Sequence, residues 1–145
     1  MAANPNPTMT SLNDIRLIDI PKIHDAKGNL SVVEGPTLPF EIKRVYYLYD
    51  VPSTAERYGN AHKLQQRVLI ALSGSFEITL KDGKNEKVVT LNKPNQGLYI
   101  PNGIWREMRN FSSGSVCLVI ASDDYDESDY LREFEDFQSF KNRTS

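Results

Sequence analysis

The stretch Gly97-Leu98-Tyr99-Ile100-Pro101-Asn102-Gly103-Ile104-Trp105-Arg106 decides the fold class of this 145-residue chain. It contains two of the short apolar or alternating segments that recur along the sequence between turn residues. Valine, isoleucine, tyrosine and phenylalanine are common in these segments, as β-strands prefer. Many short strands at this spacing predict an antiparallel sandwich or barrel. The predicted strands are 14–20, 30–34, 43–49, 67–73, 75–81, 86–92, 97–100, 105–109 and 115–121.

An earlier motif, Gly59-Asn60-Ala61-His62, continues through Gln66. Together the two motifs resemble those of the cupins, which implies an all-β fold: an antiparallel jelly roll, or double-stranded β-helix, here followed by a C-terminal helix. A metal-binding cupin has histidines at positions 60, 62 and 106 and a carboxylate near 66. This chain has Asn60, His62, Arg106 and Gln66 there. One imidazole and a guanidinium without a lone pair cannot hold a first-row divalent metal, so we expect no metal site.

The length fits one domain. Residues 1–12 are rich in Asn, Pro, Ser and Thr and predict a disordered N-terminal lead-in, with a single cupin domain over 13–145. A helix is expected at about 128–140, capped by Ser128 and packed through Leu131, Phe134, Phe137 and Phe140. We interpret the acidic cluster at 123–129 as a solvated loop with favourable charge at the helix N-terminus, in preference to a cation site.

Composition excludes several functional classes. The net charge is −2 and the sequence pI is near 5.7, so no basic field recruits nucleic acid or an anionic membrane. No apolar run is long enough to span a bilayer. The single cysteine, Cys117, lies in an apolar segment and is expected to be a buried thiol. One cysteine cannot form an internal disulfide, which suits a reducing compartment and predicts a cytoplasmic protein.

Candidate site residues lie on the inward-facing positions of the predicted strands. Asn60 and His62 share a face, and an imidazole there is either a buried hydrogen-bonded ring or a proton carrier. Tyr46 and Tyr47 point to opposite faces, so only one of these phenols can share a pocket with His62. Arginines in or near a metal-free pocket favour a ligand with a carboxylate or phosphate. Arg57 and Arg106 are the candidates, while Trp105 fits either core packing or ligand stacking.

Several separated segments resemble one family. They are residues 39–47, 57–63, 72–75, 97–101, 105–108 and 121–130. In this order they look like the WxcM-like sugar-nucleotide 3,4-ketoisomerases of the FdtA and QdtA type, over roughly residues 14–140. The resemblance implies a metal-free, cofactor-free homodimeric cupin acting on a dTDP-4-keto-6-deoxyhexose. Such an enzyme moves the ketone from C4 to C3 through an enediol, in the biosynthesis of deoxyamino sugars for surface polysaccharide.

The resemblance also implies residue roles. Tyr46 and the segment around Asn60 and His62 would carry proton transfer. Arg57 would lie near the nucleotide or pyrophosphate, and Arg106 and Lys27 would influence the stereochemistry at C4. The rest of the expected substrate-binding set consists of Arg44, Trp105, Tyr99 and Gln66.

Two positions depart from the family pattern. The family has His-x-His where this chain has Asn60-Ala61-His62, and Arg67 replaces a usual glutamine. An asparagine side chain cannot take up and return a proton at neutral pH. Three interpretations are possible. His62 takes over proton transfer together with Tyr46, or the protein is a related sugar epimerase or isomerase, or it is a non-catalytic nucleotide-sugar-binding cupin.

Overall fold

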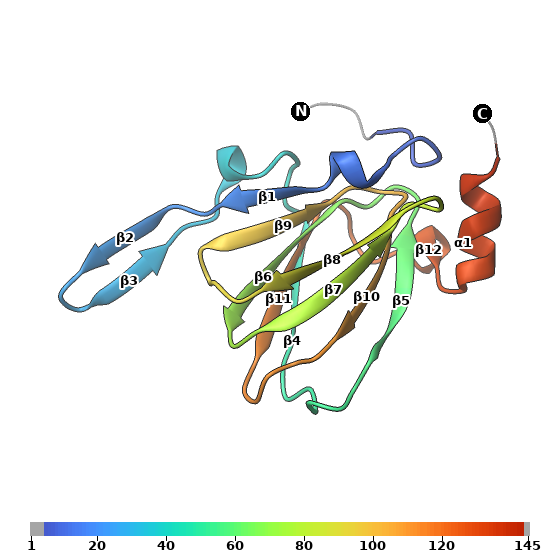
Figure 1. Cartoon of the computed structure of the whole chain (residues 1–145). Coiled ribbons are helices and arrows are strands. Elements are labelled where there is room, and N and C mark those ends of the chain that lie inside the picture. Colours follow the sequence, from blue (N-terminus) through green and yellow to red (C-terminus); the bar gives the residue numbers. More distant parts are fainter. Residues whose placement is uncertain (1–4, 144–145) are drawn as a thin grey trace.

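Two five-stranded antiparallel sheets face each other in the computed structural model (Figure 1), which describes residues 5–143 except the side chains of Arg57 and Tyr58. The order in the first sheet is β1 (Arg16–Asp19), β9 (Gln96–Ile100), β6 (Arg67–Ser73), β11 (Val116–Ala121) and β4 (Arg44–Leu48). In the second sheet it is β12 (Tyr130–Leu131), β5 (Arg57–His62), β10 (Trp105–Arg109), β7 (Phe76–Lys81) and β8 (Glu86–Leu91). The predicted antiparallel jelly roll is confirmed.

Alternation along the strands separates the inside of the barrel from its outer faces. Leu69 and Ala71 of β6 point inward and pack with Ile78 and Leu80 of β7 in the main apolar core. Each fully buried leucine or isoleucine side chain among them stabilises the fold by about 1.5–3 kcal/mol. The neighbouring positions of β6 point outward into a second cluster, which the segment 33–42 covers. Strand parity therefore decides which side chains can reach the interior.

Tight turns close two hairpins. The predicted Asp82-Gly83 turn joins β7 to β8, and the Asp82 carboxylate accepts the backbone N–H groups of Lys84 and Asn85 at 2.9 and 2.8 Å. Gly83 has a φ of +98°, which glycine adopts without strain. A second hairpin, β2 (Lys22–Asp25) and β3 (Gly28–Ser31), turns near Lys27. It projects from the barrel (Figure 1), and its first strand was not predicted.

The C-terminal helix is shorter than expected. Helix α1 spans Phe134–Lys141, and the preceding residues form a 3₁₀ turn, η3 (Glu127–Asp129), followed by β12. The prediction that Ser128 caps a helix was wrong, because Asp126 caps η3 and Tyr130 then pairs with His62 of β5. Backbone groups used in that pairing cannot enter a helix. Within the part of the chain that the structure describes, no helix is long and apolar enough to cross a membrane.

The described part of the predicted disordered lead-in is anchored to the barrel. The Asn102 side chain donates to the Pro5 carbonyl at 2.7 Å, and the Thr10 hydroxyl donates to the Asn102 carbonyl at 2.7 Å. Lys141 of α1 donates to the carbonyls of Pro7 and Thr10 at 2.9 and 2.7 Å. Two further 3₁₀ turns follow, η1 (Leu12–Asp14) and η2 (Gly35–Thr37). Residues 1–4 of the lead-in lie outside the described range.

Candidate active site

Polar side chains gather inside one end of the barrel, beyond the apolar core. We call them the polar cluster. Each comes from an inward-facing position or from the loop that closes that end. Its members are Arg44, Tyr46, Asn60, His62, Gln65, Arg67, Arg106, Asp129 and Tyr130.

Strand register explains why these residues meet. Tyr46 lies opposite Val119, a core residue, so its ring points into the barrel. Arg67 lies two positions before Leu69 on β6 and shares its inward face. On the second sheet, Asn60 is the cross-strand partner of Arg106. The two sheets thus contribute facing polar residues to one volume.

His62 is held on both ring nitrogens. Its Nδ1 lies 3.1 Å from Asp129 Oδ2, and its Nε2 lies 3.3 Å from the side-chain nitrogen of Gln65. A carboxylate only accepts, so Nδ1 carries the proton and Nε2 accepts from Gln65. Burial, reinforced by the Arg67 charge, lowers the pKa of His62 to about 3, although Asp129 opposes the shift. The imidazole is therefore neutral, and its side chain is only 1% exposed.

Arg67 crosses the interior of the cluster. It is 1% exposed, and its Nη1 donates to Asn60 Oδ1 at 3.0 Å. The Tyr46 side chain lies within hydrogen-bonding reach of the same guanidinium. Burial and then the charge of Arg106 lower the pKa of Arg67 to about 9. The barrel interior thus contains two neighbouring guanidinium groups.

Arg44 closes the cluster at its edge. Its Nη2 donates to Gln65 Oε1 at 3.2 Å, and its guanidinium lies over the Tyr46 ring, 4.7 Å from the centroid. The Tyr130 ring packs against His62 with centroids 4.2 Å apart. These contacts fix Tyr46 between two cations and place its phenol among hydrogen-bond donors.

The cluster has the chemistry of an anion site that can also transfer protons. Among the described residues, no carboxylate forms an ion pair with Arg44, Arg67 or Arg106, and the Nε atom of each has no hydrogen-bond partner. No group of three or more His, Cys, Asp or Glu side chains within the described range is placed to hold a metal ion. The residues present do not fit a metal, because arginines cannot ligate one. They fit an anionic ligand.

Five of the ten predicted site residues come together in this cluster, four lie elsewhere, and the side chain of Arg57 lies outside the described part of the structure. Tyr46, Asn60, His62, Arg44 and Arg106 are its members, as described above. In contrast, Tyr99 packs in the outer cluster and donates to Gln66 Oε1 at 2.6 Å, outside the barrel. Lys27 lies at the turn of the projecting hairpin, away from its own barrel (Figure 1). Sequence motifs mark neighbouring positions, but side chains on alternate residues point to opposite faces.

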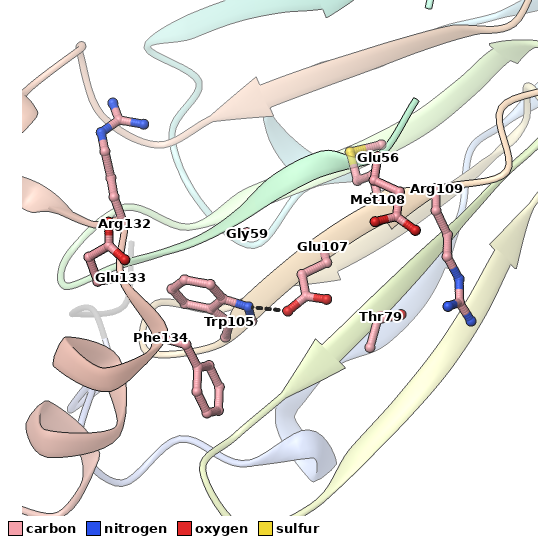
Figure 2. Close-up of a pocket in the computed structure, with 10 residues that line it drawn as sticks. All are labelled: Glu56, Gly59, Thr79, Trp105, Glu107, Met108, Arg109, Arg132, Glu133 and Phe134. Atoms are coloured by element: carbon pink, nitrogen blue, oxygen red, sulfur yellow. Dashed lines mark hydrogen bonds between the residues drawn. The ribbon is translucent and has the colours of Figure 1, made fainter. Parts of the chain in front are cut away.

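Trp105 also faces outward. It packs on Phe137 of α1 and donates to Glu107 at 2.7 Å. A groove of about 710 Å³ on the outer face of the second sheet is lined by Trp105 and Phe134, and its lining includes no member of the polar cluster. Figure 2 shows the two rings next to each other. Trp105 therefore has a packing role in α1 docking. The predicted Arg57 begins β5, and its side chain lies outside the described part of the structure.

Sequence reasoning missed four members of the cluster. Arg67 was noted only as a departure, Asp129 was assigned to a solvated loop, Tyr130 was assigned to a helix, and Gln65 was not singled out. The available signal was a lone arginine at the start of the apolar strand Val68-Leu69-Ile70-Ala71. Asp129 gave no such signal, because its contact with His62 spans 67 positions.

Comparison with known proteins places the chain in a family. The model described as FdtA, WxcM-like, C-terminal, matches residues 13–142. The TDP-4-oxo-6-deoxy-alpha-D-glucose-3,4-oxoisomerase of Aneurinibacillus thermoaerophilus is 41% identical over 126 residues, which is 86% of this chain and 91% of that protein.

Solved structures agree with this result. QdtA of Thermoanaerobacterium thermosaccharolyticum, as a histidine-to-asparagine mutant in complex with TDP-4-keto-6-deoxyglucose, has a TM-score of 0.87 and 44% identity, covering 91% of this chain and 97% of that one. The WlaRB TDP-quinovose 3,4-ketoisomerase of Campylobacter jejuni has a TM-score of 0.85 and 43% identity, covering 88% and 99%. With the jelly roll and the match over residues 13–142, the chain belongs to the WxcM-like FdtA family, as its sequence motifs indicated.

Proposed function

We propose that this protein is a metal-independent sugar-nucleotide 3,4-ketoisomerase that converts a TDP-4-keto-6-deoxyhexose into its 3-keto isomer. The observation that carries the proposal is the polar cluster. Inside the barrel of a chain that belongs to this family, Arg44 lies over the Tyr46 ring, Arg67 lies within hydrogen-bonding reach of the Tyr46 side chain, and Arg106 lies near Arg67. None of the three arginines has a carboxylate partner among the described residues. The relatives described above are named as enzymes of this reaction or contain this substrate.

The reaction needs a proton carrier and support for an oxyanion. Tyr46, as a phenolate, takes the proton from C3, and the electron pair moves through the C3–C4 bond to place negative charge on O4. The O3 proton then passes to O4, and Tyr46 returns its proton to C4. Neighbouring guanidinium groups stabilise negative charge on the phenol oxygen and on the enediolate. These proton transfers require no metal ion and no redox cofactor.

His62 has a supporting role in this scheme. Both of its ring nitrogens are engaged, and its lowered pKa makes it a weak base. It holds Gln65 and Asp129, and Gln65 accepts from Arg44. His62 thereby keeps Arg44 over the Tyr46 ring. This revises the sequence-based expectation that His62 shares proton transfer with Tyr46.

The test is an exchange experiment. Purified protein is incubated with TDP-4-keto-6-deoxyglucose in deuterium oxide and followed by NMR. We expect deuterium at C3 of the recovered substrate and appearance of the 3-keto product. A protein that binds TDP but gives neither result would be a nucleotide-sugar-binding cupin without turnover, and the proposal would be rejected.

We also propose a homodimer in which the projecting hairpin and the outer face of β4 are covered by a second copy. Ile23 and Leu30 of the hairpin are 61% and 56% exposed in the single chain. Tyr47 on β4 is 60% exposed, and its ring stacks near Tyr49. Exposed apolar side chains on an arm and on an edge strand support pairing between copies. In such a dimer, Lys27 at the tip of the hairpin could reach the barrel of the second copy.

We assign the protein to the cytoplasm. Its single thiol, Cys117, is buried, as expected from the sequence, and a chain that lacks an internal disulfide fits a reducing compartment.

A further inference from the structure

We propose that Asn60 is an oriented hydrogen-bond donor to the oxyanion of the enediolate, held in place by the buried Arg67 beneath it. This inference rests on the proposed function and assigns a role to the residue that departs most from the family pattern. In this scheme Asn60 is a catalytic residue, since it touches the reacting oxygen, and Arg67 is a positioning residue that acts through it.

The orientation of the Asn60 amide follows from its partner. Arg67 Nη1 lies 3.0 Å from Asn60 Oδ1. A guanidinium group has only donors, so it must face the amide oxygen and never the amide nitrogen. The Asn60 Nδ2 group, with its two hydrogens, is therefore turned away from Arg67. No side chain within the described range accepts a hydrogen bond from it.

Burial and strand pairing hold Arg67 and Asn60 in place. Arg67 is 1% exposed, begins the central strand β6, and lies within hydrogen-bonding reach of Tyr46. Asn60 is only partly buried, and its strand is paired to β10 opposite Arg106. One guanidinium thus fixes both the amide of Asn60 and the phenol of Tyr46. A ligand that reaches Tyr46 would meet the Nδ2 group of Asn60 beside it.

A preorganised neutral donor suits this step. Negative charge develops on O4 when the C3 proton is removed, and a fixed N–H group stabilises it without reorganisation. An imidazole at position 60 would instead contact the Arg67 guanidinium, with Arg106 opposite in the strand ladder. The positive charges of both guanidinium groups would destabilise the protonated form of that imidazole. Asparagine at 60 and arginine at 67 are therefore a compatible pair, and one contact accounts for both departures from the family.

The test compares five variants for turnover and for TDP affinity, with folding checked by thermal unfolding. Asn60→Asp keeps the shape but replaces the donor by an acceptor, and the new carboxylate can still pair with Arg67. We expect kcat to fall by about 10²–10³-fold with little change in TDP affinity. Asn92→Asp makes the same exchange at an exposed position outside the cluster and should leave kcat unchanged.

Arg67 is tested by Arg67→Met and Arg67→Lys. Arg67→Met removes the donor to Asn60 and should lower kcat with a much smaller effect on KM, because Arg44 and Arg106 remain in the cluster to bind the anionic substrate. Arg67→Lys keeps a charged donor and should recover part of the loss. A purely structural role would instead lower both variants' stability without this split between kcat and KM.

The outcomes separate this inference from the proposed function. If the wild-type protein is active and Asn60→Asp retains full kcat, the proposed role of Asn60 is wrong, and the proposed function still stands. Asn60→His in the presence of Arg67 should not raise turnover; a large gain would mean that position 60 needs a base, and the inference is then wrong. A wild-type protein that binds TDP but shows no exchange removes the proposed function itself.

Discussion

His62 and Asp129 are 67 positions apart in the chain and form a buried hydrogen bond of 3.1 Å at the closed end of the polar cluster. Asp129 also accepts the backbone N–H groups of Leu64 and Gln65 at 2.7 and 3.1 Å. Burial alone would raise the pKa of Asp129, but hydrogen bonds from His62 and these amides lower it overall. One carboxylate therefore joins β5, the loop that follows it, and η3.

The buried His62–Asp129 pair predicts that the free energy of unfolding decreases at acidic pH. His62 is neutral in the folded protein down to a pKa of about 3, whereas in the unfolded chain it binds a proton below about 6.5. The unfolded state binds more protons between these values, so stability falls as the pH drops from 6.5 toward 3. The His62 contribution alone should cost about 2 kcal/mol between pH 7 and pH 5.

Chemical denaturation at several pH values measures this effect. His62→Gln keeps polar groups in place without a titrating ring and should flatten the dependence on pH. His24→Gln alters the exposed hairpin histidine and should leave it unchanged. Equal slopes for wild type and His62→Gln would contradict the buried neutral imidazole.

Removal of the Tyr46 hydroxyl should abolish most of the activity. Tyr46→Phe keeps the ring beneath Arg44 but removes the group that exchanges protons. We expect kcat to fall by about 10²–10⁴-fold, with TDP affinity preserved. Tyr47→Phe is the matched control, since the adjacent phenol points outward and is 60% exposed. Deuterium uptake at C3 gives the readout, and equal loss in both variants would argue against Tyr46 as proton carrier.

The hairpin should control the oligomeric state. Leu30→Asp places a charge on the exposed apolar arm and should halve the molecular mass seen by light scattering, because burial of an unpaired carboxylate is costly. Leu72→Asp, at another exposed leucine (46%) at the end of β6, should leave the mass unchanged. A wild-type protein that is already monomeric at micromolar concentration would contradict the proposed dimer.

Helix α1 offers a test of packing. Phe137 is 0% exposed and packs against Trp105 and Ala61, so Phe137→Ala should lower the free energy of unfolding by about 3–5 kcal/mol. Phe134, one turn earlier, is 38% exposed and meets Trp105 edge-on. Phe134→Ala should cost only about 1 kcal/mol. Urea denaturation compares the two, and similar losses would contradict the docking of α1 through Phe137.

Local patterns predicted the strands well where alternation was strong. β6, β7, β8, β9, β10 and β11 lie within one or two residues of their predicted bounds, because side-chain parity and turn residues are encoded locally. The same reasoning failed for β12. Tyr130 and Leu131 fit a helical spacing, but their backbone pairs with β5, and a tertiary partner overrides such a pattern.

The sequence also predicted only part of the candidate site, namely the positions that strand alternation determines. Parity placed Asn60 and His62 on one inward face and separated Tyr46 from Tyr47. Motif membership alone put Tyr99 and Gln66 in the site, although both lie on the outer face. Asp129 was missed because a loop acid and its buried histidine partner carry no shared local signal.

The amino-acid sequence by itself determined the all-β class, the family and the loss of all but one of the expected metal ligands in the two motifs, since these depend on residue type, order and alternation. Only the tertiary structure decided that Arg67 lies against Asn60 and that His62 is enclosed by Asp129 and Gln65. Hydrogen bonds and charge interactions act over a few ångströms in space. Only the packing of the two sheets against each other brings together side chains that lie far apart in the sequence.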